Sequence, residues 1–319
     1  MAQSVLITGA AGFIGSSVAR RLGEGGARVV GLDNYCDFYD PAIKRARAKG
    51  LRDDLGIEIV EGDIRDRADV DRAFASASPE VVIHIAAMAG VRPSIENPKL
   101  YAEVNVDGTV NMLDVSVGAG VKKFLFASSS SVYGNNEKVP FSEDDPVDFP
   151  ISPYAATKRA GELLCHTYWH LHGLPISCLR FFTVYGPGQR PDLAIGKFMR
   201  LIDAGEPIPM FGDGTTSRDY TYIDDIVDGV LAAMDRCAGY NIYNLGGSSP
   251  VSLSDLIAAI GRVCGADPVI DRLPMQAGDV ERTFADTSRS ERELGFRSKV
   301  SLDEGLRRQR DSMLAGSDA

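Results

Sequence analysis

The sequence predicts an α/β fold in which helices cover both faces of a doubly wound parallel sheet, followed by a smaller C-terminal α/β lobe. The first observation is that short apolar runs alternate with stretches of helical periodicity along the first half of the chain. The second is that these runs show no polar alternation, which is typical of strands buried on both faces. The third is a glycine-rich turn directly after the first run, where such a sheet binds a ligand.

The elements begin in the order strand, helix, strand. Residues 4–8 (SVLIT) form the first strand, a helix runs from Gly12 to about Gly23, and RVVGLD at 28–33 forms the second strand. This is a βαβ unit, the building block of a parallel sheet. The alternation continues with strands expected at 57–62, 81–86, 123–128 and 176–182, and helices expected at 68–75, 98–118 and 154–172.

The character of the chain changes after the last of these strands. Glycine and proline become dense, the apolar runs shorten, and the helices expected at 253–263 and 302–311 follow irregular links. We therefore expect residues 1–180 to form the domain with the large sheet and residues 181–319 to form a smaller lobe over the carboxyl ends of its strands. Residues 220–246 are expected to return to the large domain.

Composition and charge exclude several kinds of partner. The chain has 319 residues, of which 44% are hydrophobic, and a formal net charge of −10. Because this charge repels phosphate backbones and acidic lipids, we expect no nucleic acid and no membrane as a partner. The sequence has no basic leader and no apolar run of about 18 residues. Its five cysteines contain no C-x-x-C pair, so we expect a protein of the reducing cytoplasm.

Two histidines raise the question of a metal site. His166 and His170 are four residues apart and would share one face of a helix. No acidic or cysteine third ligand stands at a suitable spacing, so we interpret the pair as helix-surface residues and expect no metal.

The glycine-rich turn has the spacing of a dinucleotide-binding loop. Gly9, Gly12 and Gly15 lie between the first strand and the first helix, and Phe13 and Ile14 open that helix. Without Cβ atoms, the backbone amides can approach a pyrophosphate at the positive end of the helix. A glycine triplet also occurs in ordinary turns, so the prediction depends on its place between strand and helix. We expect the large domain to be a Rossmann-type dinucleotide-binding domain.

The end of the second strand selects the cofactor. Asp33 lies 18 residues beyond Gly15, where its carboxylate can accept hydrogen bonds from the adenosine ribose. The same carboxylate repels the 2′-phosphate of NADP, and the next residues, Asn34 and Tyr35, include no arginine to receive that phosphate. NAD is therefore the expected cofactor, with Asn34 among the residues that contact it.

Two further pairs stand where the carboxyl edge of the sheet would meet the cofactor. Asp63 and Ile64 follow the third strand, and Ala86 and Ala87 follow the fourth. We expect these residues to contact the adenine and the diphosphate-ribose part of NAD. The alternative is an ordinary acidic turn followed by small packing residues.

A tyrosine and a lysine open the helix that follows the fifth strand. Tyr154 and Lys158 are four residues apart and therefore share a helix face. The strand before them ends in the serine run 128–131, at the sheet edge where ligands bind in such folds. Tyr-x-x-x-Lys is common by chance on helix surfaces, so its position beside Ser129 is what makes it a candidate chemical centre.

Taken together, these motifs resemble those of the extended short-chain dehydrogenase/reductase family, and specifically its nucleotide-sugar 4-epimerases. The resemblance covers nearly the whole chain and includes TGAAGFIG, DNYCDFYD, SSSSVYG, the Tyr-x-x-x-Lys pair, RFFTVYGPGQRPD, SRDYTYIDD and GDVERTFAD. Within the family, the blocks AGVR at 89–92 and SIENP at 94–98, the RPD at 190–192 and Met275-Gln276 look most like UDP-glucuronate 4-epimerases.

The resemblance implies a role for each residue of the centre. Tyr154 takes the proton from the sugar 4-hydroxyl while hydride leaves C4 for NAD, Lys158 holds the nicotinamide ribose, and Ser129 binds the same 4-oxygen. NAD returns the hydride to the other face of the 4-ketone, so it is expected to stay tightly bound. Lowering the pKa of a tyrosine from about 10 to about 7 requires roughly 4 kcal/mol, which Lys158 and the positive nicotinamide are expected to supply.

The sugar carboxylate of a uronic acid needs donors, because its desolvation otherwise costs several kcal/mol. The family places Thr183 and Arg190 near the substrate, and Ser130 adds a hydroxyl beside the centre. Arg190 has two alternatives, a phosphate of the substrate or an ion pair with Asp192. Arg92 is expected either in the substrate loop or in a structural turn before a proline.

The substrate is expected to be a UDP-sugar. Arg218 and Lys197 are the expected partners of the UDP phosphates, and Asp279 is expected to bind a uridine ribose hydroxyl. Each of the three has the alternative of an ordinary surface charge. The resemblance also implies a homodimer that associates through the helices at 98–118 and 154–172, although their apolar positions also suit an intramolecular core.

The most strongly implied reaction is the conversion of UDP-glucuronate to UDP-galacturonate. The alternative is a UDP-glucose/UDP-galactose 4-epimerase, although those enzymes commonly carry asparagine where this chain has Thr183. Dehydratases carry an Asp-Glu pair and decarboxylases a glutamate in the serine run, where this chain has Ser130 and Ser131. An NAD-sensing protein without activity would typically lack the tyrosine or the lysine, and this chain has both.

Overall fold

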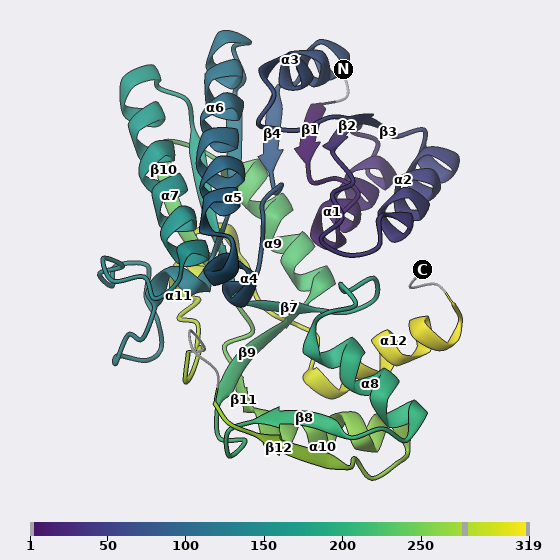
Figure 1. Cartoon of the computed structure of the whole chain (residues 1–319). Coiled ribbons are helices and arrows are strands. Elements are labelled where there is room, and N and C mark those ends of the chain that lie inside the picture. Colours follow the sequence, from purple (N-terminus) through teal and green to yellow (C-terminus); the bar gives the residue numbers. More distant parts are fainter. Residues whose placement is uncertain (1–2, 276–279, 317–319) are drawn as a thin grey trace.

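The computed structural model describes residues 3–275 and 280–316 of the chain. At its centre is a seven-stranded sheet in the order β10-β6-β5-β4-β1-β2-β3, in which all neighbouring strands are parallel (Figure 1). The strand order runs outward from β1 in both directions, which confirms the predicted doubly wound, Rossmann-type sheet. The strands are β1 (Ser4–Thr8), β2 (Arg28–Asp33), β3 (Glu58–Glu61), β4 (Val81–His84), β5 (Lys123–Ser129), β6 (Ile176–Phe181) and β10 (Tyr240–Leu245).

Helices cover both faces of this sheet. Residues of α1, α2 and α9 belong to the hydrophobic core on one face, and residues of α3, α6 and α7 belong to the core on the other. Two separate cores of this kind require strands that are apolar on both sides. The helices are α1 (Phe13–Glu24), α2 (Pro41–Leu55), α3 (Arg67–Ala77), α6 (Gly108–Gly118), α7 (Pro153–His172) and α9 (Ile223–Arg236).

Successive strand residues contribute to the two cores in turn. Val5 and Ile7 of β1 pack into the core that contains α1 and α9, whereas Leu6 packs into the core that contains α3 and α6. Phe124 and Leu125 of β5 divide in the same way. Because side chains alternate along a strand while both faces are covered, these runs are apolar at every position.

The long helix expected at 98–118 is helical over its whole length but changes its hydrogen-bond register in the middle. It consists of α5 (Pro98–Ala102), a π-helical turn (Glu103–Asp107) and α6. A π-helical turn arises when the hydrogen-bond register lengthens locally, and such turns are frequent at functional sites. The helix expected from Tyr154 begins one residue earlier, at Pro153, because the Ser152 side chain accepts a hydrogen bond from the backbone N–H of Ala155 at 3.1 Å.

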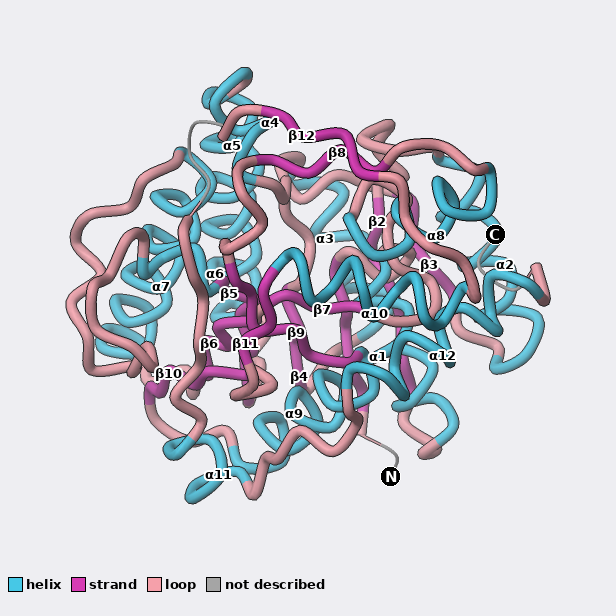
Figure 2. The backbone as a smooth tube through the Cα atoms, turned by 90° about the horizontal axis from the view of Figure 1, so that it is seen from below, coloured by secondary structure: helices cyan, strands magenta, loops and turns pink. Residues whose placement is uncertain are grey.

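The smaller lobe lies at the carboxyl ends of the strands of the large sheet. It contains two short sheets of its own (Figure 2). One has the strand order β11-β9-β7 and the other pairs β12 with β8. The strands are β7 (Thr183–Tyr185), β8 (Ile208–Phe211), β9 (Ser217–Tyr222), β11 (Pro250–Ser252) and β12 (Ile270–Leu273). The accompanying helices are α8 (Ala194–Ala204), α10 (Leu253–Cys264) and α12 (Leu302–Leu314), while α4 (Val91–Glu96) and α11 (Ser288–Leu294) are short helices elsewhere in the fold.

The segment 220–246 contributes to both parts of the molecule. Its first residues end β9, in the three-stranded sheet, whereas α9 packs against α1 and β10 pairs with β6 in the large sheet. The chain therefore crosses between the two parts more than once. In the part of the chain that the structure describes, no helix is both long enough and apolar enough to cross a bilayer.

Candidate active site

The three glycines form a tight loop between β1 and α1. Gly9 has a φ of 69°, and a Cβ added to it would lie 2.9 Å from the backbone nitrogen of Ala86. A Cβ at Gly15 would lie only 2.0 Å from the carbonyl oxygen of Gly9. Among the described residues, no side chain caps α1 at Gly12, so the first amides of the helix remain for a phosphate. The loop fits a dinucleotide.

Asp33 lies at the end of β2, beside this loop, and is 7% exposed. Its carboxylate accepts hydrogen bonds from the backbone N–H groups of Ala11 and Tyr35, each at 2.9 Å. These bonds fix the carboxylate against the glycine loop and leave further lone pairs for ribose hydroxyls. The arrangement fits an adenosine ribose whose 2′-hydroxyl carries no phosphate.

Asn34 and Asp63 lie together at the same edge of the sheet. The Asn34 amide donates to Asp63 at 2.9 Å, and Arg65 donates to both oxygens of Asp63 at 2.8 and 3.0 Å. Burial raises the pKa of Asp63, but hydrogen bonds from Arg65 and Asn34 outweigh burial and lower that pKa to about 2. Asp63 is therefore a carboxylate at neutral pH.

The other predicted cofactor residues, Ile64, Ala86 and Ala87, differ in how much of each residue is exposed at the sheet edge. The Ile64 side chain is 5% exposed and packs directly against Gly108, so only the backbone of Ile64 remains to contact a cofactor. Ala86 donates its backbone N–H to the Thr8 hydroxyl at 3.1 Å, which fixes the end of β4 beside the glycine loop. Ala87 follows it and is partly exposed.

The centre consists of a phenol and a hydroxyl from neighbouring elements. Tyr154 is partly buried in the first turn of α7, and its ring meets the Tyr101 ring edge-on, with centroids 6.3 Å apart. Burial raises the pKa of the Tyr154 phenol, while a hydrogen bond with Ser129 and the positive charge of Arg190 lower it. The effect of burial is the largest, so in this structure the pKa of Tyr154 is above its usual value.

The Lys158 ammonium is bound by the neighbouring strand β5. The buried ammonium donates to the Ala127 carbonyl at 2.6 Å and lies 5.1 Å from the Phe126 ring centroid. Burial lowers the pKa of Lys158 to about 8. The positive charge of Arg190 lowers the pKa of the Tyr154 phenol, and the action of Lys158 on that phenol stays a prediction. Residues four apart share a helix face without their long side chains having to meet.

Arg190 forms the ion pair that the sequence left as an alternative. Its guanidinium donates to both oxygens of Asp192, at 2.7 and 3.0 Å, and lies 4.9 Å from the centroid of the Phe38 ring. The Arg190 side chain is 17% exposed, whereas that of Asp192 is 46% exposed. Arg190 therefore combines a positive charge that lowers the pKa of Tyr154 with a carboxylate partner that solvent can reach.

The loop that carries Arg190 also contacts the cofactor side of the site. Arg47 of α2 donates to the Gly188 carbonyl at 2.7 Å. A Cβ at Gly188 would lie 3.8 Å from Phe13, the first residue of α1. The loop 186–192 thus packs on the residues that follow the glycine turn, so substrate and cofactor residues share a boundary.

Three more predicted substrate residues lie along the border between the two parts. Thr183 opens β7, in register with Tyr220 of β9, and Ser130 is buried in the 3₁₀ turn after β5. Arg92, on α4, places its guanidinium 4.8 Å from the Phe211 ring of β8. Arg92 therefore links α4 to the smaller lobe, a contact that neither of its sequence alternatives included.

The residues predicted to bind UDP lie in the smaller lobe. Arg218 is in β9 and donates to the Ser217 carbonyl at 2.9 Å. Lys197 is exposed in the first turn of α8. Asp279 lies outside the described residues. None of the contacts described here brings Arg218 or Lys197 to Tyr154, and their predicted role does not require such a contact.

Asn105 belongs to no motif that predicted a site, yet it holds two walls of the site together. Its side chain accepts the backbone N–H of Met88 at 2.8 Å and donates to the Met88 carbonyl and to the Thr157 hydroxyl, each at 3.0 Å. Asn105 stands in the π-helical turn, which has no local sequence signature. Tyr101, which packs on Tyr154, was missed for a similar reason, since only the folded chain brings the two rings together.

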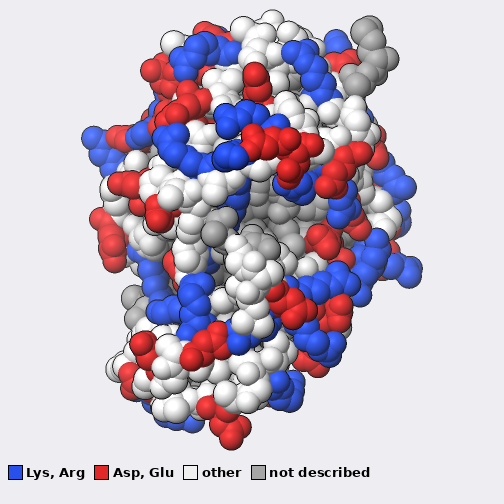
Figure 3. Space-filling model, turned by 90° about the vertical axis from the view of Figure 1, so that its right-hand side faces the viewer, with Lys and Arg blue, Asp and Glu red and all other residues white. Residues whose placement is uncertain are grey.

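One face of the molecule is hollowed across its middle (Figure 3). Lys and Arg side chains lie on both sides of this hollow, mixed with Asp and Glu side chains. The net charge of −10 is therefore not a uniformly negative surface on this side. An anionic ligand can meet local positive charge here.

Comparison with known proteins agrees with this geometry. Residues 5–246 match the model of the NAD dependent epimerase/dehydratase family. The probable UDP-glucuronate 4-epimerase of Rhizobium meliloti is 43% identical, over 95% of this chain and 94% of the relative. UDP-glucuronate 4-epimerase 3 of Arabidopsis thaliana is 46% identical, over 96% of this chain and 75% of the relative.

A solved structure extends the likeness from sequence to fold. The UDP-glucuronic acid 4-epimerase of Bacillus cereus, in complex with UDP-glucuronic acid and NAD, superposes with a TM-score of 0.91 at 34% identity. The match covers 98% of this chain and 99% of the other. On the family match and these identities, the chain belongs to the NAD dependent epimerase/dehydratase family.

Proposed function

We propose that this protein converts UDP-glucuronate to UDP-galacturonate by epimerisation at C4, with NAD as a tightly bound cofactor. The observation that carries the proposal is the likeness over 98% of the chain, at a TM-score of 0.91, to a UDP-glucuronic acid 4-epimerase that holds UDP-glucuronic acid and NAD. Arg190, whose positive charge lowers the pKa of the Tyr154 phenol, is proposed to meet the sugar carboxylate. A hexuronate carries a hydroxyl on C4 and a carboxylate on C5, which are adjacent carbons. One sugar can therefore meet the base and the guanidinium together. The relatives named as UDP-glucuronate 4-epimerases support the same substrate.

The proton transfer is assigned to Tyr154 and Ser129. Tyr154 takes the proton of the 4-hydroxyl, and Ser129, which lowers the pKa of the phenol, steadies the same 4-oxygen as it becomes a ketone. NAD, when bound, accepts the hydride from C4 and returns it to the opposite face of the ring. Tyr154 then gives back its proton, so neither the enzyme nor the cofactor changes over a full cycle.

Lys158 has a supporting role in this proposal. Its ammonium, held by the Ala127 carbonyl at 2.6 Å, is placed to bind a ribose hydroxyl of the nicotinamide half and to add positive charge near the phenolate. With a pKa of about 8, Lys158 is mostly charged at neutral pH and loses that charge as the pH rises through about 8. We expect the reaction to slow over the same interval.

The serine turn favours return of the hydride over other outcomes. The Ser129 hydroxyl donates to the Ser131 hydroxyl at 3.1 Å, and Ser130 lies between them, so hydroxyls occupy the positions where elimination or decarboxylation would use carboxylates. The 4-ketone of a glucuronate is a β-keto acid. It would lose carbon dioxide if its carboxylate moved out of the plane of the sugar ring. Thr183 and Arg190 are proposed to hold the carboxylate against that movement.

The nucleotide half is assigned to the smaller lobe. Arg218 and Lys197 are proposed to neutralise the UDP phosphates, and Asp279 is proposed to accept a hydrogen bond from the uridine ribose. The placement of Arg218 in the three-stranded sheet supports this division, because β7 of the same sheet carries Thr183.

We also propose a cytoplasmic homodimer. The helices proposed to form its interface are α5 to α6 and α7. Leu163 and Leu171 of α7, eight residues apart on one helix face, are 53% and 67% exposed. Such exposed leucines suit burial against a second copy. Light scattering coupled to size-exclusion chromatography tests the dimer, because it measures the molar mass of the protein in solution. A monomer mass at micromolar protein concentration would contradict the proposal.

One experiment tests the proposed activity directly. The purified protein is incubated without added NAD, once with UDP-glucuronate and once with UDP-glucose, and the C4 epimers are separated and quantified. Formation of UDP-galacturonate supports the proposal, and turnover without added NAD shows that the cofactor is retained. Epimerisation of UDP-glucose alone would assign the protein to the glucose class instead.

A further inference from the structure

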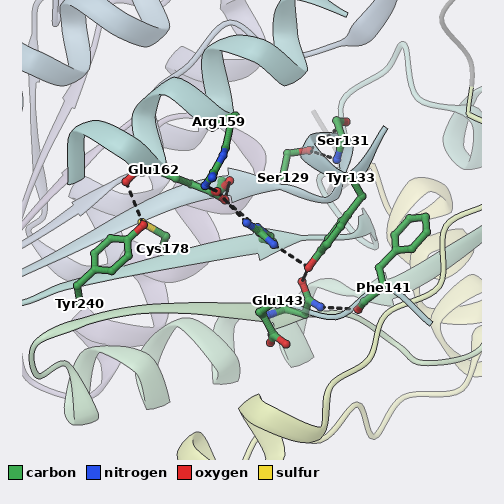
Figure 4. Close-up of polar contacts among 12 residues, drawn as sticks. Ser129, Ser131, Tyr133, Phe141, Glu143, Arg159, Glu162, Cys178 and Tyr240 are labelled. Atoms are coloured by element: carbon green, nitrogen blue, oxygen red, sulfur yellow. Dashed lines mark hydrogen bonds and ion pairs between the residues drawn. The ribbon is translucent and has the colours of Figure 1, made fainter. Parts of the chain in front are cut away.

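A chain of polar contacts runs from Glu162 to Tyr133, beside the serine turn that carries Ser129 (Figure 4). Ser128 donates to Glu162 at 2.6 Å, and Arg180 donates to the two oxygens of Glu162 at 2.8 and 2.9 Å. Arg180 also donates to the Tyr133 hydroxyl at 2.9 Å, which in turn donates to Asn244 at 2.7 Å. Side chains alone thus connect β5, α7, β6 and β10.

The ion pair in this chain is fully buried, with Glu162 0% and Arg180 1% exposed. Taking such charges out of water has a large cost, and well-packed apolar residues of similar volume are often as stabilising as a buried pair. Stability of the fold alone therefore gives no sufficient reason for these two charges. Their position relative to the reacting groups gives one.

Two members of the chain are direct neighbours of the centre. Ser128 precedes Ser129 in β5, so its bond to Glu162 fixes the strand end from the side opposite to the Ser129 hydroxyl. Glu162 stands four residues after Lys158 on α7 and therefore shares its helix face with it. Glu162 thus links the strand that carries the serine to the helix that carries the tyrosine and the lysine.

We propose that Glu162, held by Arg180, is a positioning residue that acts on the reaction through Ser128 and Lys158 without touching substrate or cofactor. This inference rests on the proposed function, because it assumes that Ser129, Tyr154 and Lys158 perform the chemistry. The pair sets the distance between the end of β5 and α7, and the Glu162 carboxylate keeps a negative charge behind the buried ammonium.

The electrostatic part of this role has a definite sign. Burial lowers the pKa of Lys158 to about 8, while the negative charge of the Glu162 carboxylate opposes that effect. Loss of the Glu162 charge would lower the pKa of Lys158 further, so the ammonium would lose its proton at a lower pH. The charged or titratable groups on the elements packed around Lys158 include Tyr154, Arg159, Glu162 and Cys165 on α7, His84 on β4, and Cys178 and Arg180 on β6; Arg159 also forms an ion pair with Glu162, at 3.1 Å.

The test compares Glu162→Gln with a charge-free double variant, Glu162→Leu with Arg180→Met. The readouts are kcat, KM, the pH profile of kcat and the melting temperature, with UDP-glucuronate as substrate. If the wild type turns over only UDP-glucose, that sugar is used instead, so failure of the proposed substrate is separate from failure of this inference. Asp203→Asn, which removes the carboxylate from the Arg310 pair in the smaller lobe, is the matched control.

We expect Glu162→Gln to lower kcat about tenfold while KM stays within about twofold, because a misplaced reacting group affects the chemical step more than binding. Its alkaline limb should move to lower pH, and the double variant should show the same loss of kcat at a wild-type melting temperature. A folded double variant with the kcat and pH profile of the wild type would overturn the proposal. If neither variant folds, Ser128→Ala decides, since unchanged kcat overturns the proposal and lowered kcat at unchanged KM supports it.

Discussion

Replacement of Arg190 by glutamine tests the assignment of the sugar most sharply. The guanidinium has two measurable roles in the structure, since it pairs with Asp192 at 2.7 and 3.0 Å and lowers the pKa of Tyr154. If it also binds the sugar carboxylate, Arg190→Gln should impair UDP-glucuronate far more than UDP-glucose. The acid limb of kcat should move to higher pH, because the pKa of the base rises when the positive charge is lost.

The expected rise in KM follows from two contributions. Arg190 gains hydrogen bonds to the substrate carboxylate, and it gives up its ion pair with Asp192. Hydrogen bonds to charged groups contribute about 1.5–3 kcal/mol. An ion pair as exposed as that with Asp192, whose side chain is 46% exposed, contributes about 0–1 kcal/mol and is given up on binding. The difference is roughly 0.5–3 kcal/mol, so KM for UDP-glucuronate should rise between about twofold and about 150-fold.

The assay measures initial rates for both sugars with the wild type, Arg190→Gln and the matched variant Asp192→Asn. Asp192→Asn frees the guanidinium, so its KM for UDP-glucuronate should stay level or fall by up to about fivefold. Equal losses for the two sugars in Arg190→Gln would refute the assignment of Arg190 to the carboxylate. An unmoved acid limb would refute its action on the tyrosine.

Three further outcomes are expected. Gly15→Ala should give protein without bound NAD, because the new Cβ would lie 2.0 Å from the Gly9 carbonyl oxygen. The bound NAD is measured as nucleotide released when the protein is denatured, and a full complement of NAD would contradict the prediction. Tyr154→Phe should lose about 10²- to 10⁴-fold in kcat while still binding UDP-sugar, measured by turnover and calorimetry; a wild-type rate would remove Tyr154 as the base. Thr183→Ala should increase the decarboxylated product during turnover, detected by mass spectrometry, and no increase would show that Thr183 does not restrain the keto acid.

The sheet was largely predictable because its strands are apolar on both faces. β1, β2, β5 and β6 lie where their apolar runs predicted them, and α7 begins beside its serine cap. Shorter strands of the smaller lobe were not identified, since β8 pairs with the distant β12 and neither has a long apolar run. Pairing between distant short segments is a property of the folded chain and not of local propensity.

Within the site, residue types were predictable but side-chain directions were not. The Tyr-x-x-x-Lys spacing placed Tyr154 and Lys158 on one helix face, yet the ammonium is directed at Ala127 of the neighbouring strand. The effect of the Arg190 charge on the Tyr154 phenol depends on how the loop after β7 packs, and no periodicity encodes that. Asn105 was missed because a π-helical turn follows from tertiary packing.

The course of α9 and β10 determines how this molecule can be divided. Both elements come after β9 in sequence, yet they complete the large sheet, where β10 covers the outer edge of β6. A protein truncated after residue 180 would therefore expose β6, a strand buried at every position, as a bare sheet edge. The large domain is not an autonomous module, so evolution by shuffling of whole domains would have to carry the two parts together.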